Sequence, residues 1–227
     1  MNFIVYFLIY NKLMLIAHRG YSDKYVDNSE ESFREAIRSG FDMIELDINI
    51  CKSGELVIFH DTLIDGINVN DYDLHTLYNK YGIITLDFYF KNINTNIIKT
   101  YIDIKGNDDT VDYLCNYFLN INKEINMELI FFASFNMNHL DIIQNKLPAI
   151  NVGLITSNKF NVYELEFLLN KYTFFAFHWE CFDNKLYTFL HNRNKLVFLY
   201  TCHNHDEYTY ITNKFKFDGL VSNICVK

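Results

Sequence analysis

The sequence is poor in the residues that build linkers. Its 227 residues include one proline and eight glycines, and no stretch is rich in proline, glycine or serine. It also lacks internal repeats and low-complexity segments. Linkers and repeats of these kinds mark domain boundaries and solenoid architectures. We therefore expect one domain, and the length is close to that of a single α/β barrel.

Cysteines are few and scattered. The five cysteines are an odd number, and no two of them form a CxxC pair. This pattern argues against a disulfide framework and against a structural zinc site. We expect free thiols and a reducing intracellular compartment.

A long hydrophobic run is also missing. The apolar stretch at residues 2–10 (NFIVYFLIY) is too short to span a membrane, and it lacks the basic region and cleavage site of a signal peptide. We interpret residues 1–12 as an apolar extension and expect the barrel domain to cover residues 13–227. Three interpretations of this extension stay open: an extra strand, a membrane-surface contact, or a segment that precedes a true start at Met14.

Basic residues are outnumbered. The chain has 20 Lys and Arg against 28 Asp and Glu, for a net charge of −8. Binding to a nucleic-acid backbone requires clustered basic side chains, so we do not expect nucleic acid as the partner. An acidic cluster that holds a metal remains compatible with a small anionic substrate.

Short β-rich runs alternate with stretches of helical period from Leu13 onward, the pattern of a parallel sheet with crossover helices. Eight such runs predict an α/β fold, a closed (β/α)₈ TIM barrel. The predicted strands are Leu13–Ala17, Met43–Ile48, Thr100–Ile104, Glu128–Ala133, Asn151–Ile155, Phe174–His178, Leu196–Thr201 and Gly219–Ser222. Predicted helices include Asn28–Ser39, Asp109–Phe118, Met137–Asn145, Val162–Leu169 and Asp206–Lys214. Thr62–Lys99 fits least well and is predicted to be a loop-rich insertion with one short helix.

The first candidate site residues follow the first strand, in LIAHRG. This apolar run ends in His18, Arg19 and Gly20. Active sites of this fold lie at the carboxyl ends of the strands. Two polar side chains and a glycine at such an end therefore suggest chemistry there.

The second strand, MIELDINI, carries two acids in its apolar pattern. Side chains alternate along a strand, so Glu45 and Asp47 point to one face and their apolar neighbours to the other. The outer face of a barrel strand packs on helices, so both carboxylates should face inward. Buried acids need a cation or a shared proton. Oxygen ligands suit Mg²⁺ or Ca²⁺, while an ion pair with Lys or Arg is the alternative.

The stretch CKSGELVIFHD predicts a β-hairpin after the second strand. Lys52, Ser53 and Gly54 form the expected turn, and Glu55–Phe59 the returning strand. A turn centred on residues 52–53 places His60 opposite Glu45. The hairpin should therefore bring a second histidine, His60, close to the carboxylate pair.

The third strand ends in YIDIKG. The same alternation places Asp103 and Lys105 on one face. Asp103 is a candidate third metal ligand, and Lys105 can neutralise a phosphoryl oxygen. A plain ion pair between the two is the alternative.

These motifs together resemble the glycerophosphodiester phosphodiesterase family. HRG (18–20), the acid-Asn pair Asp27-Asn28, ELD (45–47) and HD (60–61) carry the resemblance, with weaker similarity in ASF (133–135), NVGLI (151–155) and DGLVSN (218–223). The similarity implies a metal-dependent TIM barrel that cleaves glycerophosphodiesters to glycerol 3-phosphate and an alcohol. It also implies roles for seven residues: acid/base histidines His18 and His60, metal ligands Glu45, Asp47 and Asp103, and phosphate contacts Arg19 and Lys105. The metal would be Mg²⁺ or Ca²⁺, with Mn²⁺ as a third candidate.

The sequence departs from the family pattern at four places. Asp27 and Asp103 stand where the family usually has Glu, Tyr200-Thr201 replaces a Trp-Thr pair, and Ser222-Asn223-Ile224 replaces Thr-Asp-Pro. These departures concern the surroundings of the site more than its chemistry. They leave the substrate head group less defined than the reaction type.

Other histidines are weaker candidates. His178 and Trp179 could line the pocket beside Asp27 and Asn28, and His203 and His205 could reach its mouth without making a zinc site. We expect His75, His139 and His191 on the surface.

Two other readings stay open. One is a phosphodiesterase of the sphingomyelinase D or lysophospholipase D type, and the other is a non-catalytic binding barrel. The sequence leaves undecided which histidine is acid and which is base, whether water or a glycerol hydroxyl attacks, and the oligomeric state.

Overall fold

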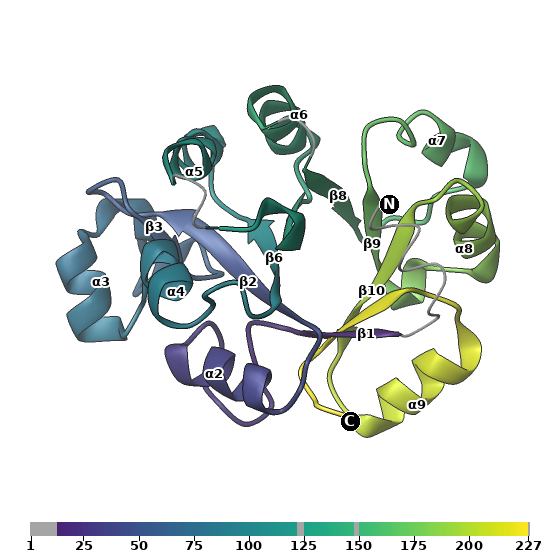
Figure 1. The fold of residues 1–227 in the computed structure, drawn as a ribbon, viewed down its shortest axis with the longest axis horizontal. Helices are drawn as coiled ribbons and strands as arrows, with labels where there is room; N and C mark the ends of the chain where they lie inside the picture. Colours follow the sequence, from purple (N-terminus) through teal and green to yellow (C-terminus); the bar gives the residue numbers. More distant parts are fainter. Residues whose placement is uncertain (1–12, 122–124, 148–149, 227) are drawn as a thin grey trace.

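The protein is a closed barrel of eight parallel strands with helices around it (Figure 1). The computed structural model describes residues 13–121, 125–147 and 150–226. The predicted extension at residues 1–12 lies outside these. The barrel strands are β1 (Met14–Ala17), β2 (Met43–Ile50), β6 (Lys99–Ile104), β7 (Ile130–Ser134), β8 (Asn151–Thr156), β9 (Phe174–His178), β10 (Leu196–Cys202) and β11 (Gly219–Ser222). Parallel pairing of β1 with both β2 and β11 closes the barrel, so the predicted fold is confirmed.

Alternation along the strands separates two cores. On β2, Met43 packs inside the barrel, while Ile44, Leu46 and Ile48 pack outward against the helices. The barrel interior is filled with aromatic rings, and the Phe174 and Phe198 centroids lie 5.0 Å apart. The barrel interior is therefore a packed core, and the pocket described below lies at the carboxyl ends of the strands.

The crossover helices begin at side-chain caps. At the start of α2 (Glu30–Arg38), the Ser29 side chain accepts from the backbone N–H of Ser32, and the Ser32 side chain accepts in return from the Ser29 N–H. Such a capping box satisfies backbone donors that a helix start leaves unpaired. The remaining helices outside the 62–99 segment are α5 (Asp108–Asn120), α6 (Met137–Lys146), α7 (Val162–Glu166), α8 (Asn184–His191) and α9 (His205–Lys214), with 3₁₀ turns η2 (Met127–Leu129) and η3 (Trp179–Cys181).

The predicted hairpin after the second strand is present, with its register shifted by one residue. β3 (Leu56–Ile58) runs antiparallel to β2, with Ile48 opposite Ile58. Cys51 faces Glu55 across a three-residue turn in which Gly54 has φ 93°. The turn centre is therefore Ser53, and the expectation that His60 lies opposite Glu45 is wrong by one position. The Phe59 N–H donates to the Asp47 carbonyl, and His60 follows directly at the pocket.

Residues 62–99 hold more structure than predicted. They form β4 (Leu63–Ile64), β5 (Ile67–Asn68), η1 (Val69–Asp71) and two helices, α3 (Leu74–Tyr81) and α4 (Leu86–Asn92). Asp73 and Thr85 cap the two helices. The prediction of one short helix is wrong because both helices are only about two turns long, with His, Thr, Tyr and Asn in α3 and Asp, Phe, Tyr and Asn in α4. Those residues have a modest helix propensity, so caps and packing decide the structure.

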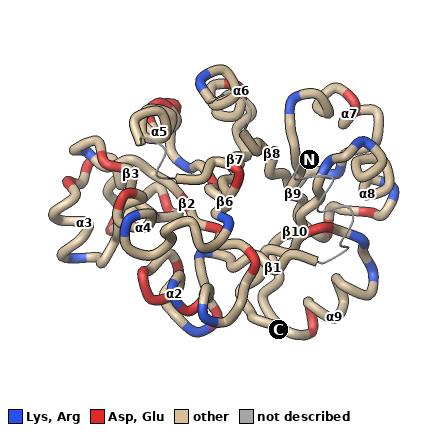
Figure 2. Tube along the Cα trace, viewed as in Figure 1, with Lys and Arg blue, Asp and Glu red and all other residues tan. Residues whose placement is uncertain are grey.

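Charged side chains of both signs are interspersed along the outer helices (Figure 2). Many of them are paired on the surface, for example Arg34 with Glu30 and Lys146 with Asp112. Exposed pairs of this kind contribute little stability. The charges that require an explanation lie inside the barrel mouth.

Candidate active site in the barrel mouth

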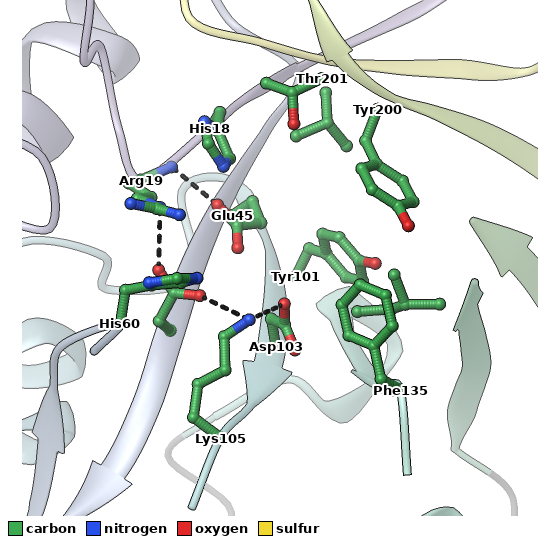
Figure 3. A pocket seen from close by; sticks show the side chains of 13 residues that line it. His18, Arg19, Glu45, His60, Tyr101, Asp103, Lys105, Phe135, Tyr200 and Thr201 are labelled. Atoms are coloured by element: carbon green, nitrogen blue, oxygen red, sulfur yellow. Dashed lines mark hydrogen bonds and ion pairs between the residues drawn. The ribbon is translucent and has the colours of Figure 1, made fainter. Parts of the chain in front are cut away.

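A pocket of about 130 Å³ opens at the carboxyl ends of the barrel strands. One water molecule needs ~10–15 Å³ measured in this way, so the pocket has room for a small ligand. All seven residues for which sequence analysis implied a catalytic, metal-binding or phosphate-binding role line it: His18, Arg19, Glu45, Asp47, His60, Asp103 and Lys105 (Figure 3).

The loop after β1 places the first two of these. Arg19 and Gly20 both have positive φ, 54° and 81°, which turns the chain sharply. The turn aims the Arg19 N–H at Glu45, and the N–H donates to Glu45 Oε2 at 2.7 Å. A Cβ on Gly20 would lie 2.3 Å from Ser32 Oγ, so the loop packs directly on α2. Glycine is required here by both backbone conformation and space.

Three buried carboxylates form the centre of the pocket. Oxygens of Glu45, Asp47 and Asp103 lie within 4.8 Å of one another. Lys105 Nζ is 2.6 Å from Asp103 Oδ2 and 3.3 Å from Asp47 Oδ1, and Arg19 Nε is 3.2 Å from Asp47 Oδ2. The inward orientation predicted for Glu45 and Asp47 is confirmed. Both the acidic cluster and the ion pairs considered as its alternative are present.

The two cations do not balance the cluster. Three ionised carboxylates carry three negative charges against the two positive charges of Arg19 and Lys105, which leaves one in excess. Burial, followed by the charges of Asp47 and Asp103, raises the pKa of Glu45 well above its ordinary value. Burial also raises the pKa of Asp103 to about 6, although Lys105 opposes this.

One carboxylate oxygen lacks a donor. No described residue donates to the buried Asp103 Oδ1. Buried oxygens are rarely left without a partner. The unpaired oxygen, the excess charge and the raised pKa of Glu45 fit a divalent cation, and an all-oxygen donor set suits Mg²⁺, Ca²⁺ or Mn²⁺.

The His18 ring is held in a defined, neutral form. Its Nδ1 lies 2.7 Å from the side-chain oxygen Oδ1 of Asn223. The side-chain nitrogen Nδ2 of Asn223 lies 3.1 Å from His203 Nδ1. Because the carbonyl oxygen only accepts, His18 Nδ1 donates and its Nε2 is left as an acceptor. Burial, followed by the charge of Arg19, lowers the pKa of His18 to about 4.

His60 approaches the pocket from the hairpin. It is half-buried, and its Nδ1 lies 2.7 Å from Asp61 Oδ1. A carboxylate in this position orients the ring. The two histidines thus have different partners: His18 Nδ1 faces the Asn223 side-chain amide, whereas His60 Nδ1 faces the Asp61 carboxylate.

Asp27 and Asn28 support the pocket from outside its lining. Asp27 pairs with Arg19 Nη1 at 3.0 Å and lies in an adjoining groove. Asn28 is buried, and its amide donates to Asp47 Oδ2 at 2.8 Å. They position Arg19 and Asp47.

The remaining predicted residues lie further away. Among the residues that the structure describes, those that line the pocket do not include His178 or Trp179. The His178 ring packs edge-on against Tyr200 and stacks on Trp179. His203 is linked to His18 through Asn223, whereas His205 is exposed at the start of α9.

The surface positions predicted for three other histidines are confirmed only in part. His75 is exposed and His191 is half-buried. The prediction for His139 is wrong, because the side chain is buried on α6. Its Nδ1 lies 3.3 Å from Ser134 Oγ and its Nε2 3.3 Å from Asp108 Oδ1. Two polar neighbours make its burial tolerable.

Several pocket residues were not singled out as site residues in the sequence. The apolar wall consists of Tyr101, Phe135, Ile155, Tyr200 and Val221. Alternation would have found Tyr101, two positions before Asp103. Nothing in the sequence indicated that Asn223 belongs to the site, apart from its position after the last strand. Its role depends on its closeness to His18 in the fold, which the sequence does not show.

Comparison with known proteins agrees with this geometry. The glycerophosphoryl diester phosphodiesterase family model matches residues 18–225. A glycerophosphodiester phosphodiesterase of Caldanaerobacter subterraneus subsp. tengcongensis is 29% identical over 162 residues, covering 63% of this chain and 67% of that protein. Human lysophospholipase D is 39% identical over 62 residues, covering 26% of this chain and 20% of that protein.

Solved structures share the fold. An Oleispira antarctica phosphodiesterase, in complex with the product sn-glycerol-3-phosphate, superposes with a TM-score of 0.82 at 19% identity and covers 93% of both chains. A Thermotoga maritima glycerophosphodiester phosphodiesterase gives 0.74 at 21% identity, covering 94% of this chain and 96% of that one. Within residues 13–121, 125–147 and 150–226, no helix is long and apolar enough to cross a membrane.

Proposed function

This chain belongs to the glycerophosphoryl diester phosphodiesterase family, and from that premise we propose that it hydrolyses a glycerophosphodiester to glycerol 3-phosphate and an alcohol in a metal-dependent reaction. The observation that carries this proposal is the meeting of two histidines with a buried three-carboxylate cluster in one pocket. A non-catalytic barrel has no need to keep this costly arrangement.

Glu45, Asp47 and Asp103 would hold the cation. A bound Mg²⁺, Ca²⁺ or Mn²⁺ supplies Lewis-acid stabilisation of charge on a phosphoryl oxygen. Lys105 and Arg19 line the same pocket and would contact the remaining phosphoryl oxygens. The guanidinium can bind two oxygens in parallel, whereas the ammonium acts as a point charge.

His18 is the proposed base. Its pKa of about 4 keeps the ring neutral at pH 7, and its free Nε2 can accept the proton of the attacking hydroxyl. The attacking group is water or a neighbouring glycerol hydroxyl. Attack on phosphorus forms one P–O bond while the bond to the alcohol oxygen breaks. Attack by water gives glycerol 3-phosphate directly, whereas attack by the glycerol hydroxyl gives a cyclic phosphate that water then opens to glycerol 3-phosphate.

His60 is the proposed acid. Its contact with Asp61 orients the ring, which would deliver a proton to the departing alcohol oxygen. Each transfer of this kind typically contributes roughly 10²–10⁴-fold in rate. The assignment of the two roles follows from the different surroundings of the two rings.

The primary test is release of glycerol 3-phosphate from glycerophosphocholine and glycerophosphoethanolamine. The assay is run with Mg²⁺, Ca²⁺, Mn²⁺ or EDTA, beside His18→Ala. Release that requires a metal and is lost in the variant supports both the reaction and the base. No release with any metal would overturn the proposal.

A second substrate arm uses lysophosphatidylcholine, because a short segment of this chain aligns with human lysophospholipase D. Choline release from this lipid alone would favour that alternative. Cys51, Cys115, Cys181, Cys202 and Cys225 are all free, which supports the further proposal that the protein works in a reducing compartment.

A further inference from the structure

Tyr200 stands on the wall of the pocket that lies across from Glu45 and Arg19 (Figure 3). Its ring is held from two sides. The Phe135 ring meets it edge-on at 6.2 Å between centroids, and the His178 ring does so at 5.6 Å. Two such contacts fix the direction in which the hydroxyl points.

The hydroxyl of Tyr200 is buried without a partner. It points into the pocket above Tyr101 (Figure 3), and no described residue forms a hydrogen bond with it. Burial, and then the charge of Asp103, raises its pKa above the ordinary value, so it remains a donor. An oriented, unpartnered hydroxyl in a ligand pocket points to a hydrogen bond that the ligand completes.

The surroundings indicate what kind of group completes that bond. Burial, and then the negative charge of the Asp103 carboxylate, raise the pKa of the Tyr200 phenol. The same negative charge repels an anionic group of a ligand at this hydroxyl. Arg19 and Lys105, which would contact the anionic phosphoryl oxygens, lie beside Asp47 and Asp103. The rest of this wall is Phe135, Ile155 and Val221. A neutral hydroxyl on a short carbon chain matches both the donor and the apolar lining.

We propose that the Tyr200 hydroxyl binds a free hydroxyl of the glycerol moiety and makes the enzyme select substrates that carry it. This inference rests on the proposed function. It places the glycerol on the Tyr101–Tyr200 wall and directs the departing alcohol toward His60. An acyl chain or a bare methyl group at this position would leave the phenol without a partner, which is unfavourable.

The test compares kcat/KM for glycerophosphocholine with that for two analogues, each lacking one of the two free glycerol hydroxyls. The wild-type protein should prefer the full substrate over one analogue by roughly 10- to 100-fold. Tyr200→Phe should lose most of that preference and hydrolyse that analogue as fast as the wild type does.

Tyr172→Phe is the matched control. The Tyr172 hydroxyl is likewise buried, has no partner among the described residues, and lies in the outer core beside Phe175. Removing this hydroxyl should leave kcat/KM unchanged for all three substrates. Both variants should be at least as stable as the wild type, because each loses a hydroxyl that has no partner in the free protein.

The outcomes separate the two proposals. Wild-type protein that cleaves none of the three substrates refutes the proposed function. Wild-type protein that cleaves them, combined with a Tyr200→Phe variant of unchanged preference, refutes the role of Tyr200. An equal loss on all substrates also refutes it, because that pattern reports damage to the site rather than selectivity.

Discussion

The side-chain amide of Asn28 holds Asp47 at two points: its Nδ2 donates to Asp47 Oδ2 at 2.8 Å, and its Oδ1 accepts from the Asp47 N–H at 3.3 Å. Asn28 has φ 55°, a conformation that asparagine tolerates better than most residues. One residue thus joins the β1–α2 loop to β2, the strand that carries two of the proposed metal ligands. These two hydrogen bonds between Asn28 and Asp47, called the clamp below, fix one carboxylate oxygen of Asp47 before any cation binds.

Asn28→Asp should therefore weaken the fold and the proposed metal site together. A carboxylate in place of the amide faces Asp47 with a like charge, and we expect a loss of about 1–3 kcal/mol in the free energy of unfolding. Chemical unfolding with EDTA and with Mg²⁺ measures both effects. Asn138→Asp is the control, since Asn138 also donates to an aspartate but on the surface. An equal effect in the two variants would contradict the clamp.

Glu45→Gln should stabilise the metal-free protein and abolish its stabilisation by metal. The raised pKa of Glu45 means that the folded state binds a proton more tightly than the unfolded state. Metal-free stability should accordingly fall as the pH rises from the unfolded value of 4.5 through the raised folded value. Removing the charge in Glu45→Gln should raise the free energy of unfolding of the metal-free protein by about 1–2 kcal/mol at pH 8, which corresponds to a few degrees in Tm.

The same linkage governs metal binding. A cation competes with the proton on Glu45, so the rise in Tm on adding Mg²⁺ or Ca²⁺ should be larger at pH 8 than at pH 5. Thermal unfolding of both proteins at the two pH values measures this. A metal effect that persists in Glu45→Gln, or that grows at low pH, would contradict Glu45 as a ligand.

His18 and His60 should respond differently to the leaving group. If His60 protonates the departing alcohol, His60→Ala should lose roughly 10²–10⁴-fold on glycerophosphocholine. It should lose much less on the p-nitrophenyl diester of glycerol 3-phosphate, because nitrophenolate leaves without a proton. His18→Ala should be impaired on both. Reversed behaviour of the two variants would exchange the acid and base assignments.

Gly20→Ala should destabilise the fold strongly. The new Cβ would lie 2.3 Å from Ser32 Oγ and 2.8 Å from the Ser32 carbonyl carbon, at φ 81°. We expect a loss of about 2–4 kcal/mol. Gly82→Ala is the control, because Gly82 has φ 70° and nothing within 4 Å, so only the backbone cost of about 1–2 kcal/mol applies. Equal losses would show that packing on α2 does not matter.

The sequence by itself determined the barrel and the chemistry at its mouth. Alternation along MIELDINI and YIDIKG separates inward acids from outward aliphatic residues, because only apolar side chains pack against the helices. The strands were predictable because each repeats this simple burial rule. The hairpin that brings back His60 was predictable from its turn, apart from the shift of one residue in its register.

Only the tertiary structure decided contacts between residues that lie far apart in the chain. The link from His18 to Asn223 spans 205 positions, and the clamp from Asn28 to Asp47 joins a loop to a strand. The burial of His139 beside Asp108 likewise depends on a neighbour that local patterns do not contain. The physical reason is that a strand pattern shows which face is buried, whereas the partner of a buried polar atom is set by how the closed barrel brings distant strand ends together.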